Sequence, residues 1–146
     1  MPIQFFNEEV ELKLIHAKDA KKWLDEVIAE EIHKAGAVNI IFCNDEYLLK
    51  LNKQFLSHDY YTDVITFNNS NKKILAGDIF ISIERVKENA EIYKCSFFEE
   101  LYRVMVHGVL HLLDYDDATP ELKLKMTEKE NYYLLKMNNP IKNLKK

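Results

Sequence analysis

The feature that most constrains this chain is a nearly uncharged run over residues 104–113 that contains two histidines, His107 and His111. On a helix, residues four apart project from the same face, one turn from each other. Two imidazoles in an apolar stretch are costly to bury unless something satisfies their nitrogens. The fold must therefore supply either a shared metal ion or ordinary hydrogen bonds to backbone and water at the edge of a core.

A third candidate ligand follows the helix. Asp117 lies six residues after His111, where a turn would swing its carboxylate back toward the imidazoles. Two neutral imidazoles and one carboxylate suit zinc, and three protein ligands leave one coordination position open. The pattern predicts one zinc ion bound by His107, His111 and Asp117. Because helices often place histidines four apart by chance, two ordinary histidines remain the alternative at this point.

Two neighbours of the histidines bear on the type of reaction. Asp116 is the nearest candidate for a base, or for a partner that orients a ligand imidazole; the alternative is a solvated turn carboxylate. Gly108 stands where zinc peptidases with the H-E-x-x-H motif carry their glutamate base, which disfavours a peptidase. A glycine there allows a close approach, by packing or by substrate. The catalytic candidates are His107, His111 and Asp116.

Residues 107–116 read His-Gly-Val-Leu-His-Leu-Leu-Asp-Tyr-Asp, and this run resembles the signature of the YbeY family. Members of that family are bacterial rRNA maturation factors described as single-strand endoribonucleases. Further matches in the same order are Leu51-Asn52, residues 59–67 (Asp-Tyr-Tyr-Thr-Asp-Val-Ile-Thr-Phe), residues 76–82 (Ala-Gly-Asp-Ile-Phe-Ile-Ser) and a weaker Met126 with Glu130. The matches span about residues 44–130.

The resemblance implies a zinc-dependent single-strand endoribonuclease that acts on rRNA and in ribosome quality control. Three positions depart from the family pattern: Asp117 replaces its third histidine, Asp114 a glycine, and Leu56 an arginine. Aspartate is a legitimate zinc ligand, and it also accepts a left-handed backbone at a helix end. Leu56 removes a phosphate-facing cation. A ribosome-associated assembly factor with a mainly structural metal is therefore the alternative, and a metallopeptidase is the third reading.

Five residues are candidates for substrate binding. Arg103 lies one turn before His107 and either approaches phosphate or pairs with Glu99 or Glu100 on its own helix. Lys53 and His58 lie near the lost arginine and can partly replace its charge. Thr62 and Asp63 match the family's Thr-Asp, which implies a place in the cleft; the alternative is an ordinary turn before a strand.

Composition sets the class. The 146 residues, 47% hydrophobic and 30% charged, fit one globular domain over residues 1–146. We expect a cytoplasmic protein without a membrane partner, because no apolar run approaches the ~20 residues of a membrane span and the N-terminus lacks signal character. Cys43 and Cys95 are isolated and read as reduced thiols. A net charge of -4 argues against a general nucleic-acid binder. RNA, and not DNA, is the partner that the resemblance implies. The oligomeric state stays open.

Periodicity and capping signals give the order of elements. Ser96 and Glu99 form a capping box, Ser82 caps a helix, Thr119-Pro120 starts the last helix, and Gly36 is expected to stop the first one. Predicted helices cover residues 19–34, 45–55, 83–93, 97–113 and 120–137, and predicted strands cover 3–6, 37–42, 64–67 and 78–81. The fold class is α/β (α+β). The resemblance implies a small mixed four-stranded sheet flanked by helices, with the metal-binding helix near 97–113.

Overall fold

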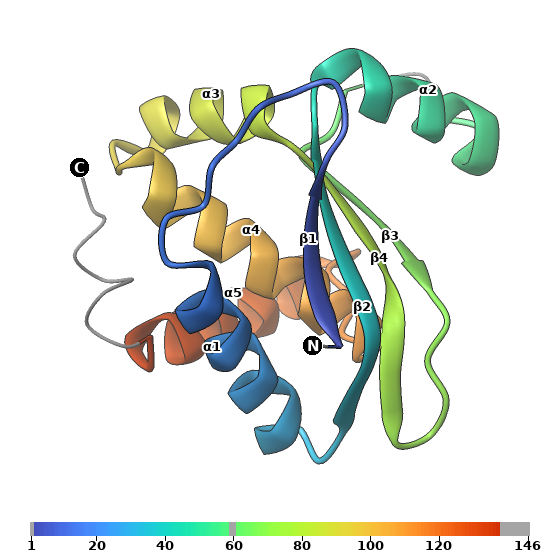
Figure 1. The fold of residues 1–146 in the computed structure, drawn as a ribbon, viewed down its shortest axis with the longest axis vertical. Helices are drawn as coiled ribbons and strands as arrows, with labels where there is room; N and C mark the ends of the chain where they lie inside the picture. Colours follow the sequence, from blue (N-terminus) through green and yellow to red (C-terminus); the bar gives the residue numbers. More distant parts are fainter. Residues whose placement is uncertain (1, 59–60, 138–146) are drawn as a thin grey trace.

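A computed structural model of the chain describes residues 2–58 and 61–137. Strands and helices alternate through the first half, and helices follow in the second half (Figure 1). The elements are β1 (Ile3–Asn7), α1 (Ala17–Glu30), β2 (Lys34–Cys43), α2 (Asp45–Leu56), β3 (Val64–Asn68), β4 (Ile74–Ser82), α3 (Ile83–Tyr93), α4 (Phe97–Leu112) and α5 (Pro120–Leu135). This order confirms the predicted α/β class.

The four strands form one mixed sheet in the order β1-β2-β4-β3. Strands β1, β2 and β4 pair in parallel, while β3 is the antiparallel edge strand on β4. Parallel neighbours need crossover connections, and α1 supplies the one from β1 to β2. The polar turn after β3 closes a hairpin, in which the Asn71 side chain accepts hydrogen bonds from the backbone N–H groups of Lys73 and Ile74. The mixed four-stranded sheet is thus confirmed.

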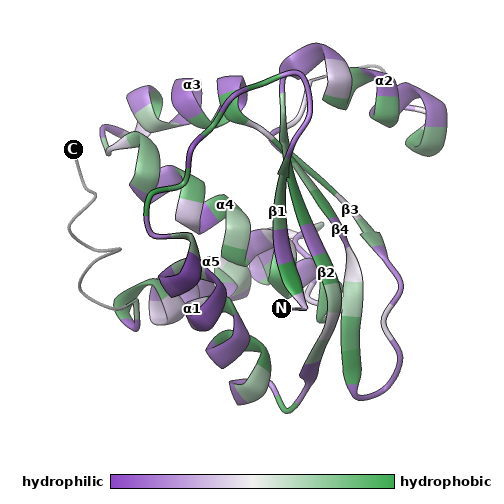
Figure 2. Ribbon diagram, viewed as in Figure 1, coloured by the Kyte–Doolittle hydropathy of each residue, from purple (hydrophilic) through white to green (hydrophobic). Residues whose placement is uncertain are grey.

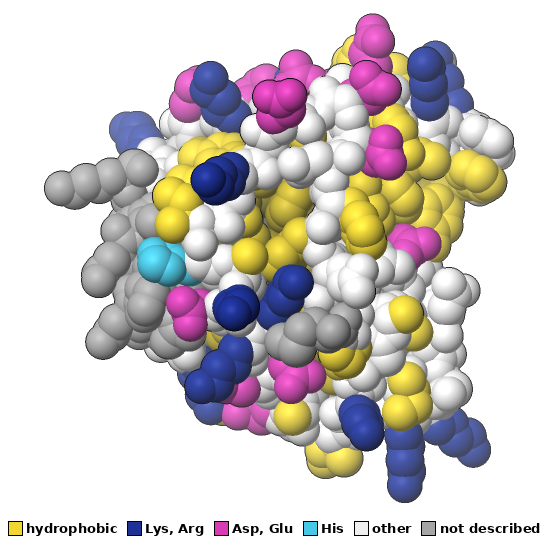
Figure 3. Space-filling model, in the orientation of Figure 1, with side chains coloured by type: hydrophobic (Ala, Val, Ile, Leu, Met, Phe, Trp, Pro, Cys, Tyr) yellow, Lys and Arg dark blue, Asp and Glu magenta, His cyan; other side chains and the backbone are white. Residues whose placement is uncertain are grey.

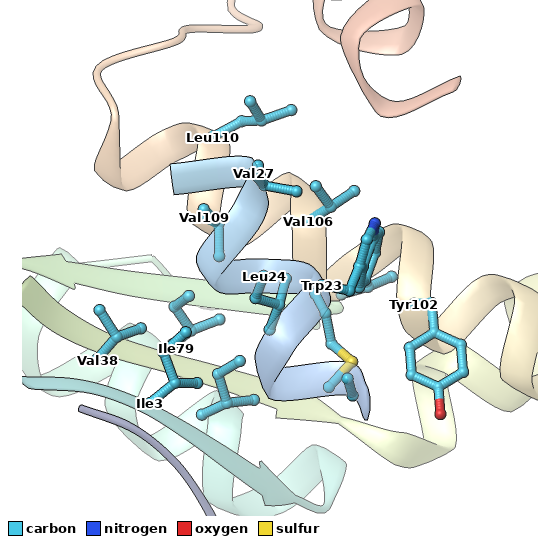
Figure 4. Packing of buried hydrophobic residues seen from close by; sticks show 14 of the residues in the cluster. Ile3, Trp23, Leu24, Val27, Val38, Ile79, Tyr102, Val106, Val109 and Leu110 are labelled. Atoms are coloured by element: carbon cyan, nitrogen blue, oxygen red, sulfur yellow. The ribbon is translucent and has the colours of Figure 1, made fainter. Parts of the chain in front are cut away.

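Helices α1 and α4 cover one face of the sheet and enclose the main core, in which Leu24, Ile79 and Val109 are fully buried (Figure 4). Helix α2 packs over β3 and β4 around a smaller cluster that contains Leu48 and Ile65. Alternate residues of a strand point to opposite faces, so β4 serves both clusters. Helices α3 and α5 pack on α4, which therefore lies at the centre of the helical layer.

The capping residues correctly predict where the helices in the second half of the chain begin. Ser96 accepts a hydrogen bond from the Glu99 N–H, and the Glu99 carboxylate accepts one from the Ser96 N–H, so both halves of the capping box are present. Ser82 caps α3, and the Thr119 hydroxyl accepts from the backbone of α5. These local bonds satisfy N–H groups that a helix start leaves without partners.

The predicted end of the first helix is wrong. Helix α1 ends at Glu30, not near residue 34, and Gly36 lies inside β2. A Cβ on Gly36 would lie 2.6 Å from Ile74 Cγ2 of the paired strand, so the glycine permits close strand contact and does not stop a helix. Ile32, with φ 62°, makes the left-handed turn between the two elements. Pairing with β4 prevails over the helical pattern here.

Within the described part of the chain, no helix has both the length and the apolar character that crossing a membrane requires. Both cysteines are free, as expected. Cys43 is fully buried, and burial raises the pKa of its thiol to about 12. Cys43 is therefore a core residue and not a nucleophile at neutral pH.

Candidate metal centre

Helix α4 holds the two histidines against the sheet. It is one of the most hydrophobic elements of the fold (Figure 2), and the residues on either side of each histidine are buried. A Cβ on Gly108 would lie 2.6 Å from Ile79 Cγ2, so the glycine brings α4 close to β4. This confirms the packing role expected for Gly108. A glutamate at position 108 would point into the core, so it could not act as a base at the metal site.

The two imidazoles and Asp117 converge on one point. His107 Nε2 and His111 Nε2 are 2.9 Å apart, and Asp117 Oδ2 lies 3.4 Å from the first and 3.6 Å from the second. All three side chains are partly buried. Among the described residues, these three form the one group of histidine, cysteine or acidic side chains spaced to share a metal ion.

A tight helix end returns Asp117 to the histidines. Asp114 has a left-handed backbone (φ 69°), as expected for the residue at the family's glycine position. The Tyr115 N–H donates to the Leu110 carbonyl and the Asp114 N–H to the His111 carbonyl, which is the Schellman arrangement. The chain therefore reverses direction directly after α4.

Asp116 continues this turn. Its Oδ1 accepts hydrogen bonds from the backbone N–H groups of Asp117 (2.7 Å) and Ala118 (3.1 Å). Its carboxylate thus fixes the backbone at Asp117. The far nitrogens of the imidazoles have other partners, so Asp116 does not orient a ring in the way considered from the sequence.

Those partners define which nitrogens carry protons. His107 Nδ1 lies 2.6 Å from Glu130 Oε2, and His111 Nδ1 lies 3.0 Å from the Tyr115 carbonyl oxygen. A carbonyl and a carboxylate only accept, so each Nδ1 is the protonated nitrogen. In the neutral rings, both Nε2 atoms therefore present lone pairs to each other and to Asp117. Such support of the far nitrogen is usual for metal-binding histidines.

A divalent ion fits this donor set. A proton on one ring, donated to the other Nε2, would satisfy the histidines but leave Asp117 Oδ2 at 3.4 and 3.6 Å from the two Nε2 atoms, longer than a usual N–H···O hydrogen bond. A cation contacts all three donors at once. Tetrahedral coordination with bonds of about 2.0–2.1 Å separates ligand atoms by about 3.3 Å. The three separations in the structure, 2.9, 3.4 and 3.6 Å, lie around this value.

The histidines differ in proton affinity. Burial lowers the pKa of His107, but the hydrogen bond and charge of Glu130 and the charge of Asp117 outweigh it and raise the pKa above its ordinary value. Burial and the neighbouring His107 lower the pKa of His111. A proton at this site therefore resides on His107, and a metal ion must displace it, which makes metal affinity fall at low pH.

Arg103 pairs across helices and not within its own. Its guanidinium donates to Glu130 Oε1 at 2.9 Å and to Asn131 Oδ1 at 2.7 Å, both on α5. The alternative pairing with Glu99 or Glu100 is therefore wrong. Because Glu130 also holds His107, the contact places a positive charge beside the carboxylate that supports a candidate ligand.

Two cavities meet at Asp117. The larger, about 940 Å³, is lined by Asp63, Glu100, Arg103 and His107 among others. The smaller, about 380 Å³, is lined by two candidate ligands, His111 and Asp117, and by three other residues singled out from the sequence, Leu56, His58 and Thr62. Thus four of the five predicted substrate contacts line one cavity or the other, two in each. Lys53 lies in the last turn of α2 and is not among the described residues that line either one.

A buried acid, Glu100, and a partly buried one, Asp63, line the larger cavity. Glu100 is 5% exposed, and burial together with the charge of Asp63 raises its pKa to about 7. Burial also raises the pKa of Asp63, which His107 partly offsets. Asp63 accepts a hydrogen bond from the Asn89 amide. Glu100 was missed as a site residue, although an acid on the buried side of an apolar helix was the available signal.

Glu130 was also missed in its structural role. The sequence match of Met126 and Glu130 to a family motif marked the position, but no local pattern connects it with a histidine 23 residues earlier. Tyr115 belongs to the signature itself, and its backbone carbonyl accepts the corresponding hydrogen bond from His111 Nδ1. Both supports come from the segments that follow α4.

An α/β fold with a His-His-Asp centre between two cavities defines a candidate metal-binding enzyme. A sequence model described as Endoribonuclease YbeY matches residues 3–138. The Endoribonuclease YbeY of Cytophaga hutchinsonii is 46% identical over 130 residues, which cover 88% of this chain and 91% of the relative. That of Amoebophilus asiaticus is 45% identical over 134 residues, 91% of each chain.

A solved structure supports the same relationship. The solution structure of TM1509 from Thermotoga maritima has a TM-score of 0.63 and 31% sequence identity, and the match covers 90% of this chain and 85% of that one. The chain therefore belongs to the Endoribonuclease YbeY family, as its motifs predicted. An endoribonuclease is a hydrolase that acts on RNA, which is the class of enzyme this family defines.

Proposed function

We propose that this protein is a zinc-dependent single-strand endoribonuclease acting in rRNA maturation and ribosome quality control. One observation carries the proposal: in a chain of this family, three lone-pair donors, His107 Nε2, His111 Nε2 and Asp117 Oδ2, converge between two cavities. The donor set suits one zinc ion with an open coordination position. The name of the relatives, endoribonuclease, supports RNA as the substrate.

When bound, zinc supplies a Lewis acid that polarises a phosphoryl oxygen and lowers the pKa of water to about 7. The residues of the chain do the rest. His107 and His111 are oriented by their Nδ1 hydrogen bonds, and Asp116 holds the backbone that carries Asp117. In this proposal Asp116 acts by positioning Asp117, while His107 and His111 act as ligands.

The RNA would lie along the two cavities. Arg103 supplies positive charge to the larger cavity, and His58 and Thr62 supply an imidazole and a hydroxyl to the smaller one. Asp63 and Glu100 place two carboxyl groups in the larger cavity, where burial raises the pKa of both, that of Glu100 to about 7. Carboxyl groups attract phosphate less than basic or hydroxyl groups do. We expect the substrate phosphate on the side of the smaller cavity.

The second candidate function is a ribosome-associated assembly factor whose metal is mainly structural. The observation that favours it is Leu56, which is 40% exposed and lines the smaller cavity at a position where the family resemblance implies an arginine. On the face seen in Figure 3, basic and acidic side chains are interspersed, which does not resemble the basic surface of a general nucleic-acid binder. A closed fourth coordination position would favour this function; an exchangeable water there would favour the enzyme.

The remaining proposals concern the cellular location, the partners and the peptidase alternative. A cytoplasmic protein with RNA as partner and no DNA or membrane partner agrees with the free cysteines and the net charge of -4. A peptidase is disfavoured because position 108 faces the core.

Elemental analysis of the purified protein, followed by RNA cleavage assays, tests the proposal. We expect near-stoichiometric zinc, cleavage of single-stranded RNA, loss of cleavage with a chelator, and recovery on addition of zinc. A double-stranded RNA of the same sequence is the substrate control. Zinc-loaded protein that folds normally and cleaves no RNA would favour the assembly factor.

A further inference from the structure

A single carboxylate outside the site links the two supports of the histidines. Glu31 follows α1, and its side chain is 13% exposed. Its Oε1 accepts a hydrogen bond from the Tyr115 hydroxyl at 2.6 Å. Its Oε2 accepts from Lys129 Nζ at 2.9 Å and from the Tyr133 hydroxyl. Three donors from two distant segments thus meet on one acid.

Each of those segments holds one histidine. Tyr115 carries the backbone carbonyl that accepts from His111 Nδ1. Lys129 and Tyr133 flank Glu130 on α5, and Glu130 is the partner of His107 Nδ1. Glu31 therefore fixes the loop that orients one imidazole relative to the helix that orients the other.

The contacts around Glu31 favour a defined geometry. Lys129 Nζ also lies 5.6 Å from the centroid of the Tyr115 ring and 5.8 Å from that of Tyr133, so the cation is enclosed by the same two tyrosines. Hydrogen bonds to an ionised acceptor are stronger than neutral ones. Burial alone would raise the pKa of Glu31, yet bonds from Tyr115, Tyr133 and Lys129 lower it below its usual value.

Helix α5 has a separate attachment to α1. The indole N–H of Trp23 donates to the Tyr133 carbonyl at 2.8 Å, and Lys136 pairs with Glu30 at 2.8 Å. Loss of the Glu31 charge therefore leaves α5 attached to α1, while it weakens the hydrogen bond that ties the Tyr115 side chain to the end of α1. This separation allows positioning and folding to be tested apart.

We propose that Glu31 is a positioning residue of the metal site, which holds the carbonyl of Tyr115 and the carboxylate of Glu130 in register so that both imidazoles face one ion. The inference rests on the proposed site at His107 and His111. Partners that orient metal-binding histidines usually change metal affinity by about 10–100-fold when they are lost. Glu31 acts one contact further out, so we expect a loss of about tenfold.

The test compares zinc affinity, by chelator competition, in wild-type protein, four single variants and the double variant Glu31→Gln/Tyr115→Phe. Glu31→Gln removes the charge, and Tyr115→Phe removes only the hydroxyl. Glu30→Gln is the matched control, because it breaks a neighbouring contact between α1 and α5 that does not reach the site. His107→Ala is the reference for loss of a ligand. Thermal unfolding of the metal-free proteins reports folding separately.

The expected result is weaker zinc binding in Glu31→Gln and Tyr115→Phe but not in Glu30→Gln, with similar unfolding temperatures. The double variant should lose little more than either single one, because both remove the same contact. Zinc affinity within twofold of wild type in both variants would overturn the inference. If Glu31→Gln unfolds, Tyr115→Phe still decides, because it keeps the ring and the Lys129 contact.

A second readout separates this inference from the proposed function. NMR of the metal-free protein detects the ring proton on His111 Nδ1, which the Tyr115 carbonyl protects from exchange. We expect faster exchange of this proton in Glu31→Gln and not in Glu30→Gln. If wild-type protein binds no zinc, the proposed function fails, while the exchange rate still tests Glu31. An unchanged exchange rate would overturn the positioning role.

Discussion

His107 Nδ1 lies 2.6 Å from Glu130 Oε2, and the other oxygen of the same carboxylate accepts from Arg103 at 2.9 Å. Glu130 is 6% exposed, so its charge is stabilised by these two partners and not by water. A candidate ligand, its orienting acid and a cation thus form one chain of contacts between α4 and α5. Replacing Glu130 should therefore lower the affinity for a metal ion more than the stability of the fold.

We predict that Glu130→Gln weakens zinc binding by about 10–100-fold, because a neutral amide is a poorer acceptor for the ring N–H and no longer balances Arg103. Chelator competition measures the change. The exposed Glu128 on the same helix provides the control, and Glu128→Gln should bind zinc as the wild type does. Equal affinities in the two variants would show that the contact does not support the ion.

The ligands themselves give the sharpest test. His107→Ala and His111→Ala should each remove most of the bound zinc, as measured by elemental analysis after gel filtration. Asp117→His restores the ligand set implied by the family resemblance and should keep the metal, because imidazole and carboxylate bind zinc at similar distances. Full retention in both alanine variants would refute the site.

Leu56→Arg should raise the affinity for single-stranded RNA or its cleavage. The side chain lines the smaller cavity beside His111 and Asp117, where a guanidinium can give a bidentate, charge-assisted contact to phosphate. One more phosphate contact steepens the dependence of binding on salt, so binding should be measured at two salt concentrations. Arginine at the exposed neighbour Phe55, which is absent from both described cavity linings, is the control. An unchanged salt slope in a folded Leu56→Arg protein would mean that position 56 does not face RNA.

Glu100→Gln should make the stability of the metal-free protein less dependent on pH. The pKa of Glu100 is raised from 4.5 to about 7, so its contribution to stability is fully present below about 4.5 and is lost as pH rises through 7. Glutamine removes this loss. We expect the variant to be more stable by roughly 2–4 kcal/mol at pH 8, with little gain at pH 4. Urea unfolding at both pH values measures the difference, and the same gain at both would contradict the assignment.

Asp114→Gly should stabilise the fold. Asp114 adopts φ 69° at the end of α4, a region that glycine occupies without steric cost. Relief of that cost, reduced by the greater freedom of glycine in the unfolded chain, should give up to about 1 kcal/mol. The free energy of unfolding in urea is the measurement, with Asp114→Ala as the opposite control, since alanine disfavours this backbone. A glycine variant less stable than alanine would rule out backbone strain at this position.

Sequence reasoning succeeded where the interactions are local. The capping box of Ser96 and Glu99 marked the start of α4, and the spacing of His107 and His111 placed both rings on one face. The left-handed backbone at Asp114 followed from its residue type and position. Each of these features depends on residues within one or two turns of each other, which a single sequence displays directly.

The failures have a physical pattern in common. Gly36 was expected to end a helix, but pairing of β2 with β4 takes it into the sheet. Arg103 pairs with Glu130 on another helix and not with the acids on its own helix. The role of Glu31 depends on segments 84 and more residues away. All three features depend on tertiary contacts between residues far apart in the sequence, and no local sequence pattern predicts such contacts.

The division between ligands and supports also has a consequence for the order in which the site matures during synthesis. The three candidate ligands lie within residues 107–117, so they are available as soon as that short segment has left the ribosome. Glu130 and Tyr133, which complete the support, belong to α5 and are made later. A nascent chain therefore presents its metal donors before the groups that orient them are in place, and the site acquires its final geometry only after α5 has been made.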